Sequence, residues 1–300
     1  MEAGPASRNR RASPSPTLLT HAFSQIEVAF DEAAVADMIQ CAARRADVED
    51  GGRLLGFQEF EEGCDVPVRL RVVALLPPGP RARRSPTMLF QDGEWQDWVF
   101  SLLEGLAPDL LYLGSFHHHL SNGYDQFSAG DLEGYRAFLA AYPQRFNAFL
   151  GVLMHRPLPD KQSWPEAFLA QCCRVAFVTP ETVMAVAPPR LTTRSDADPL
   201  AGRLRSRVTE LAGQDMPWHL RREFGPTLAG LHQELARLGQ TPSSAINAAQ
   251  DITFRVGPNA AIFRTAAPGL IVVRVGGEEQ TMEIEKFDPR MLTHGLQPHS

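Results

Sequence analysis

The chain has 300 residues, of which 44% are hydrophobic and 21% are charged, a composition typical of a globular protein with one large or two modest domains. A formal net charge of -6 and an isoelectric point near 5.9 argue against general binding to nucleic acid or to an anionic membrane. The sequence has no Cys-x-x-Cys pair, which disfavours a cysteine zinc site, and no run approaching ~20 apolar residues, which disfavours a membrane span. We therefore expect a cytoplasmic protein.

The N-terminal segment differs in composition from the rest of the chain. Residues 1–18 are rich in Arg, Pro and Ser and have too few apolar residues to form a core, so we expect a disordered leader. An alternating strand then covers 25–30, and Asp31 is a candidate N-cap for the helix after it. The apolar positions of that helix fall at i, i+3, i+4 and i+7: Val35, Met38, Ile39 and Ala42.

Strands and helices then alternate along the chain. Gly51 and Gly52 break the pattern after the first helix, and a strand is expected to follow them; the two glycines also allow close approach of the backbone. Further strands are expected at 68–76, 87–90, 110–113, 146–154 and 174–179, and helices at 95–106 and from Ser128 onward. Because these elements do not form a strict strand–helix–strand repeat, we expect an α/β (α+β) domain in which helices flank a mixed β-sheet.

Three consecutive histidines, His117 to His119, come after the apolar strand at 110–113. Side chains on a strand alternate between its faces, so His117 and His119 share one face while His118 points to the other. Two imidazoles on one face can hold a single metal ion, and Asp131 is the candidate third ligand. The sequence therefore predicts a metal site at His117, His119 and Asp131.

The segment Ser128-x-x-Asp131 has a second interpretation. It matches a capping box, in which Ser128 begins a helix and Asp131 closes the first turn. The two interpretations are compatible, because a helix that begins here would place the Asp131 carboxylate close to the histidine-bearing strand.

The last third of the chain, 200–300, is predicted to form a separate accessory α+β region. Residues 192–201 are polar and flexible in composition, and helices are expected at 203–213 and 218–239. Short strands are expected at 252–256, 261–264, 270–273 and 282–285. As alternatives, some of these strands complete the first domain's sheet, or the region is a ubiquitin-like module. The second alternative is disfavoured because the sequence ends without Gly-Gly.

Several of these motifs together resemble the JAMM (MPN+, JAB-domain) zinc metalloproteases, in particular bacterial deubiquitinase-like members. The resemblance covers about 25–180 and rests on four motifs in order: Glu49-x-Gly-Gly-x-Leu-Leu-Gly, Pro-Gly-Pro, Leu-Gly-x-x-His-x-His and Ser-x-x-Asp. It implies an MPN/cytidine-deaminase-like core within 19–195. Many family members have Pro after the second histidine, where this chain has Leu120.

The resemblance also implies roles for individual residues. His117, His119 and Asp131 match the Zn2+ ligands, Glu49 the catalytic acid/base, and Ser128 the transition-state stabiliser. Such a ligand set leaves a fourth position open for water, which is typical of catalytic rather than structural zinc. Glu49 would take a proton from that water and pass it to the leaving amine.

The implied function is a zinc isopeptidase or peptidase that removes ubiquitin or a ubiquitin-like protein from lysine conjugates or precursors. Its relatives work with E1- and E2-like enzymes, including in bacterial antiviral conjugation systems. Two alternatives remain. One is a non-catalytic MPN-type scaffold, which we expect to lack at least one ligand. The other is a metal-dependent peptidase that acts on a sulfur-carrier protein or a small peptide conjugate.

Overall fold

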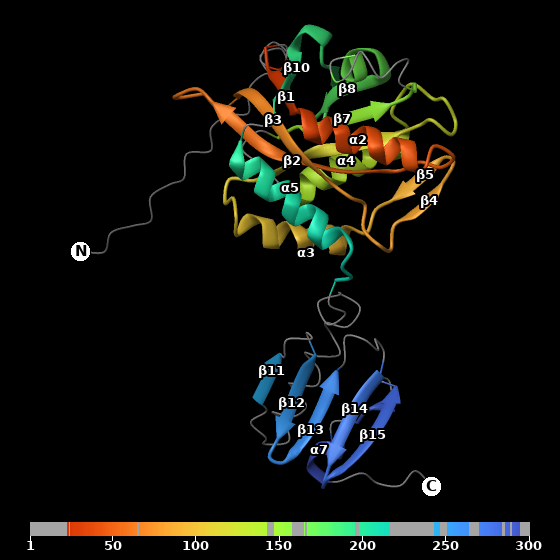
Figure 1. Cartoon of the computed structure of the whole chain (residues 1–300), viewed down its shortest axis with the longest axis vertical. Helices are drawn as coiled ribbons and strands as arrows, with labels where there is room; N and C mark the ends of the chain where they lie inside the picture. The colour runs from red at the N-terminus through yellow and green to blue at the C-terminus, as the bar shows by residue number, and fades with distance from the viewer. Residues whose placement is uncertain are drawn as a thin grey trace, which may run out of the picture. The chain divides into compact units, whose positions relative to one another are not determined.

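The protein forms two compact units, and the boundary between them lies at Gly213 and Gln214 (Figure 1). The computed structural model describes residues 23, 25–64, 66–142, 147–157, 165, 167–195, 198–216, 243–246, 251–263, 270–283, 286–288 and 290–294. The leader predicted at 1–18 and the helix predicted at 218–239 lie outside the described residues.

The first unit is built on one eight-stranded sheet. Its strands are β1 (Glu27–Asp31), β2 (Gly51–Phe60), β3 (Pro67–Leu76), β6 (Leu111–His118), β7 (Phe149–Met154), β8 (Cys173–Val178), β9 (Val183–Ala185) and β10 (Leu191–Arg194). They lie in the order β10-β1-β3-β2-β6-β7-β8-β9. The β10–β1, β1–β3 and β6–β7 pairs are parallel and the others antiparallel, so the mixed sheet predicted from the sequence is confirmed.

In the part of this unit that the structure describes, four α-helices and a small hairpin flank the sheet. The helices are α2 (Glu32–Arg44), α3 (Gly93–Glu104), α4 (Ala129–Ala141) and α5 (Pro199–Ala212). The hairpin consists of β4 (Arg83–Ser85) and β5 (Met88–Phe90), and shorter turns are the π-helix η2 (Phe168–Cys172) and the 3-10 helix η3 (Pro188–Arg190). The fold is therefore α+β, with helices flanking the sheet as expected.

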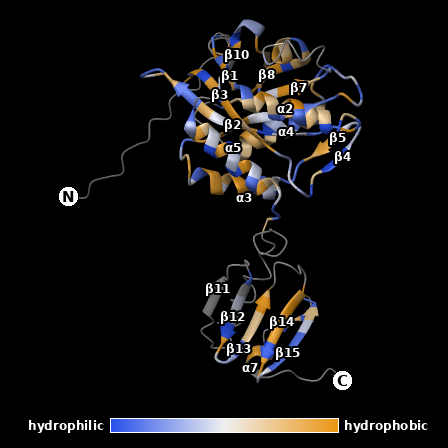
Figure 2. Ribbon diagram, viewed as in Figure 1, coloured by the Kyte–Doolittle hydropathy of each residue, from blue (hydrophilic) through white to orange (hydrophobic). Residues whose placement is uncertain are grey.

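The helices α2 and α4 cover opposite faces of the sheet. Leu150 and Val152 of β7 belong to the main hydrophobic core together with Met38 of α2. Phe149, the alternate residue, clusters instead with Tyr135 of α4. Because neighbouring strand residues point to opposite faces, both faces of β7 are buried, and Figure 2 shows this strand in the colours of hydrophobic residues.

Asp31 is the N-cap of α2 by position, but its side chain does not cap the helix. The carboxylate is fully buried and accepts hydrogen bonds from Nε and Nη2 of Arg71 at 2.9 and 2.8 Å. Arg71 also donates to Asp198 at 2.6 Å, directly before α5. The predicted side-chain cap was therefore wrong, because a buried bidentate ion pair uses the carboxylate instead.

Replacing Asp31 with Ala should lower the free energy of unfolding by about 3 kcal/mol, because it leaves the partly buried Arg71 guanidinium with Asp198 as its remaining carboxylate partner. Urea unfolding measures the change. Glu59→Ala is the matched control, since it removes a half-exposed carboxylate that pairs with Arg69, and it should cost about 0–1 kcal/mol. Equal effects of the two substitutions would contradict the assigned role of Asp31.

The sequence prediction assigned α5 to the accessory region, and this boundary needs correction. The helix buries Ala201, Leu204, Val208 and Leu211 and packs against β3 and α3 within the first unit. Residues 191–194, partly predicted to be flexible, form β10 and pair in parallel with β1. The first unit therefore extends to Gly213 rather than ending near 195.

The second unit contains a five-stranded antiparallel sheet in chain order. Its elements are β11 (Ser243–Ile246), β12 (Ile252–Val256), β13 (Asn259–Phe263), β14 (Leu270–Val275), β15 (Glu278–Glu283) and the short helix α7 (Met291–His294). Phe263, Ile271 and Val273 share a core with Leu292 of α7. These strands form their own sheet, so the alternative in which they complete the first sheet is wrong. None of the helices among the described residues has the length and apolar character needed to span a membrane.

Candidate metal centre

The histidines lie at the end of β6, between β2 and β7 in the centre of the sheet. His117 pairs with Gly51 of β2 and with Leu153 of β7. A Cβ atom at Gly51 would lie 2.1 Å from the Phe116 carbonyl oxygen and 2.8 Å from the His117 Cα atom. Gly51 is therefore required for this close approach, which sets Glu49 beside the end of β6.

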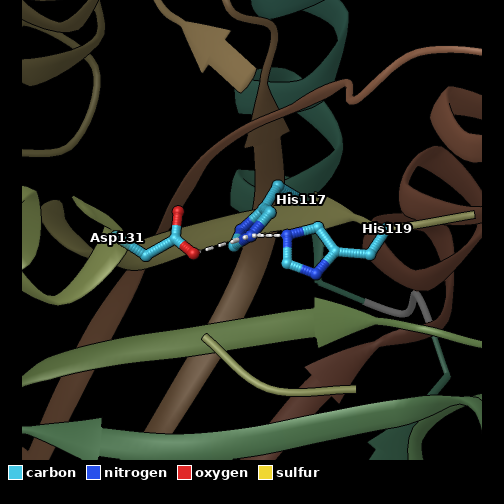
Figure 3. Close-up of side chains that lie close together, drawn as sticks. All are labelled: His117, His119 and Asp131. Atoms are coloured by element: carbon cyan, nitrogen blue, oxygen red, sulfur yellow. Dashed lines mark hydrogen bonds and ion pairs between the residues drawn. The ribbon is translucent and has the colours of Figure 1, made fainter. Parts of the chain in front are cut away.

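His117, His119 and Asp131 come together as the sequence predicted (Figure 3). Their candidate ligand atoms all lie within 4.8 Å of one another. The two Nε2 atoms are 3.1 Å apart, and Nε2 of His117 is 3.6 Å from Oδ2 of Asp131. Both imidazoles are buried. The three side chains form a possible metal-binding triad.

The partners of the two Nδ1 atoms orient the rings. Nδ1 of His119 lies 3.0 Å from the Tyr124 carbonyl oxygen, which only accepts hydrogen bonds, so in the neutral ring Nδ1 carries the proton and Nε2 keeps its lone pair. Nδ1 of His117 lies 3.3 Å from the Tyr135 hydroxyl. Such outer contacts commonly fix the tautomer of a metal-ligating histidine.

This geometry fits a tetrahedral cation. Two ligand atoms at ~2.05 Å from zinc and at the tetrahedral angle stand about 3.3 Å apart, close to two of the three separations, 3.1 and 3.6 Å, while all three atoms lie within 4.8 Å of one another. The lone pair on Nε2 of His119 faces Nε2 of His117, and a cation between the two atoms would use the lone pairs of both rings once His117 carries its proton on Nδ1. Two imidazoles with one carboxylate form a donor set that suits zinc.

Asp131 also belongs to the capping box of α4, so both interpretations of this segment hold. The Ser128 backbone N–H donates to Oδ2 of Asp131 at 2.7 Å, and the Asp131 N–H donates to the Ser128 hydroxyl at 3.1 Å. The Ser128 hydroxyl donates to the same Oδ2 at 2.8 Å. Ser128 thus lies at the triad as predicted and holds the carboxylate, while its role toward an oxyanion stays a prediction.

Glu49 lies on the other side of His119. Its Oε1 is 3.3 Å from Nε2 of His119 and accepts a hydrogen bond from Asn122 at 3.0 Å. Its backbone N–H donates to the Ser85 carbonyl in the hairpin β4–β5. The structure therefore brings Glu49 beside the triad, although 68 residues separate it from His117 in the sequence (117 − 49).

Burial is the largest single influence on the pKa of each of these groups, although at Asp131 the other influences together outweigh it. It raises the pKa of Glu49, an effect that the charge of Asp131 increases and that His117 and Asn122 oppose. It lowers the pKa of His119, in the same direction as nearby His117, and so favours the neutral imidazole that metal binding requires. Burial alone would raise the pKa of Asp131, but His117 and the hydrogen bonds from Ser128 lower it to about 2.

His118 points to the opposite face, as strand alternation predicts. It is fully buried, and neither ring nitrogen meets a hydrogen-bond partner in the described part of the chain. Burial lowers the pKa of His118 to about 4, so the ring stays neutral near pH 7. His118 therefore packs in the interior and takes no part in the triad.

Two clefts of the first unit are each lined by members of the triad. One has a volume of about 410 Å³ and is lined by Glu49, His119, Asn122 and the segment 124–126. The other, of about 280 Å³, is lined by His117 and Asp131 together with Phe90 of β5 and two glycines of α4, Gly130 and Gly134. His117 and Asp131 therefore border one cleft and His119 the other.

The sequence analysis did not find Asn122, Tyr124 or Tyr135. A faint signal for the role of Tyr135 is its place one turn after Asp131 on the helix predicted from Ser128 onward. Asn122 and Tyr124 contact the site from the loop between His119 and Ser128, where neither helix nor strand periodicity predicts which side chains face it.

No protein-family model matches the sequence, and no curated protein matches it. Among solved structures, the chain is similar to the solution structure of protein DSY2949 from Desulfitobacterium hafniense, with 15% sequence identity and a TM-score of 0.39. The match covers 56% of this chain and 94% of that chain. A similarity at this level gives no information about function. The function is therefore argued from the geometry of the site alone.

Proposed function

We propose that the protein is a zinc-dependent isopeptidase or peptidase of the JAMM type, which removes ubiquitin or a ubiquitin-like protein from lysine conjugates or precursors. One observation carries the proposal: a buried carboxyl group, Glu49, lies 3.3 Å from a histidine of a compact His-His-Asp triad. A purely structural metal site has no need for such a neighbouring acid.

Each side chain of the site has its own task in this reaction. When bound, zinc supplies a Lewis acid that brings the pKa of a coordinated water to around 7. His117, His119 and Asp131 hold the ion, and Glu49 accepts the proton released during attack on the peptide carbonyl and returns it to the leaving amine. The raised pKa of Glu49 suits a group that must both accept and donate this proton near neutral pH.

The scaffold alternative gains no support from the site. A scaffold is expected to have lost a ligand or the acid, whereas this chain has all four side chains in place. The two clefts that the triad residues border also suit an extended chain that passes through the site. E1- and E2-like enzymes and a cytoplasmic location belong to the same proposal, as members of the conjugation pathway that this activity would reverse.

Release of modifier from a lysine-linked conjugate tests the proposal. The purified protein should release free ubiquitin or a ubiquitin-like protein from an isopeptide conjugate, lose this activity with a zinc chelator, and regain it when zinc is restored. Cleavage that persists in chelator contradicts a zinc mechanism. Stoichiometric zinc binding without cleavage of any lysine-linked conjugate favours the scaffold.

A further inference from the structure

We propose that Asn122 is a positioning residue for Glu49, an inference that rests on the proposed function. Asn122 lies in the loop between His119 and Ser128, three residues after the second histidine. Its side-chain amide donates to Oε1 of Glu49 at 3.0 Å. This is the same oxygen that lies 3.3 Å from Nε2 of His119, so Asn122 holds the oxygen at the triad.

The amide of Asn122 uses nearly all of its hydrogen-bonding capacity. Nδ2 has two protons, and it donates to Oε1 of Glu49 and to the Pro86 carbonyl oxygen, the latter at 2.9 Å. Oδ1 accepts from the backbone N–H of Tyr124 at 2.9 Å. These contacts fix the orientation of the amide, because a flipped amide would turn its oxygen toward two acceptors.

A fixed donor matters because Glu49 has few other constraints on its side chain. The residue precedes β2, and its own backbone is held by the Ser85 carbonyl in the hairpin β4–β5. Loss of the Asn122 amide removes the hydrogen bond that holds Oε1 of Glu49 beside Nε2 of His119. Partners of this kind around metal sites are typically worth ~10–100-fold in activity.

Asn122 and its neighbour Ser121 provide a matched pair of variants. The Ser121 hydroxyl donates to the same Pro86 carbonyl oxygen at 2.7 Å but does not contact Glu49. Both residues therefore tie the loop to the turn of the hairpin, while only Asn122 also contacts the acid. A role in holding the loop predicts similar effects at both positions, and a role in positioning Glu49 predicts an effect at Asn122 alone.

The experiment compares Asn122→Asp with Ser121→Ala. Asp is nearly isosteric with Asn but presents only acceptors to Oε1 of Glu49 and to the Pro86 carbonyl, so kcat for isopeptide cleavage should fall ~10–100-fold with zinc content and KM little changed. Asn122→Ala, which adds no charge, should act in the same direction, and Ser121→Ala should stay near wild type. Thermal unfolding of each variant shows whether it is folded.

Three outcomes overturn the inference: near-normal kcat in both Asn122 variants, an equal loss in Ser121→Ala, or loss of zinc from the Asn122 variants. A measurement that does not depend on activity tests the role of Asn122 independently of the proposed function. The side-chain amide resonances of Asn122 in the metal-free protein should shift in Glu49→Ala and remain in place in Glu59→Ala, which removes a half-exposed carboxylate of β2 that Asn122 does not contact. If the wild type cleaves no conjugate, the proposed function fails, and these resonances still decide whether Asn122 holds Glu49.

Discussion

Glu49→Gln should reduce isopeptide cleavage by ~100- to 10,000-fold while leaving the metal bound. Gln keeps the shape of the side chain and its oxygen can still accept from Asn122, but it cannot take up a proton. A group that serves both the attack and the departure of the amine should lie toward the upper end of that range. The measurement is the steady-state rate, with zinc determined in the same sample.

The matched control is Glu59→Gln, which neutralises a half-exposed carboxylate of β2 far along the strand from the triad. It should cleave at the wild-type rate. Near-normal turnover by Glu49→Gln would refute the acid/base role. Loss of zinc together with activity would instead identify Glu49 as a ligand or a structural residue.

Replacing both His117 and His119 with Ala should abolish cleavage and zinc binding together. The double variant removes two of the three candidate ligands, and the remaining Asp131 cannot hold zinc alone. Both histidines are buried, and the ring centroid of His117 lies 6.1 Å from that of Phe127, so the fold must be checked by circular dichroism. Cleavage should fall to the background of a reaction without enzyme.

His155→Ala is the control for this variant. His155 comes directly after β7 at a neighbouring strand end and does not belong to the triad, and its backbone N–H is held by the Cys172 carbonyl. This variant should keep zinc and activity. If His155→Ala loses zinc to the same extent as the double variant, the ligand set has been assigned incorrectly.

The triad was predictable because its signals are local. Alternation on a single strand places His117 and His119 on one face, and a capping box fixes Asp131 within the first turn of α4. The same box explains why one short segment supported two interpretations, since Oδ2 of Asp131 both caps the helix and faces His117. Glu49, by contrast, was assigned only through the resemblance.

The missed features depend on contacts between distant segments. The parallel pairing of β10 with β1 joins residues more than 160 positions apart, and nothing in Leu191–Arg194 alone indicates it. In the sequence, Asp31 has the position of an ordinary N-cap, and only the structure shows that Arg71 of β3 donates hydrogen bonds to its carboxylate. Asn122 is one polar residue in a loop, and only the register of β2 against β6 places Glu49 within its reach.

The amount of zinc per chain tests the central claim most directly. Elemental analysis of the purified protein after dialysis against zinc should give one zinc per chain for the wild type and none for the variant that lacks both His117 and His119. Circular dichroism and sedimentation of the same samples establish that both proteins are folded. Undiminished zinc in the folded double variant would contradict a site at His117, His119 and Asp131.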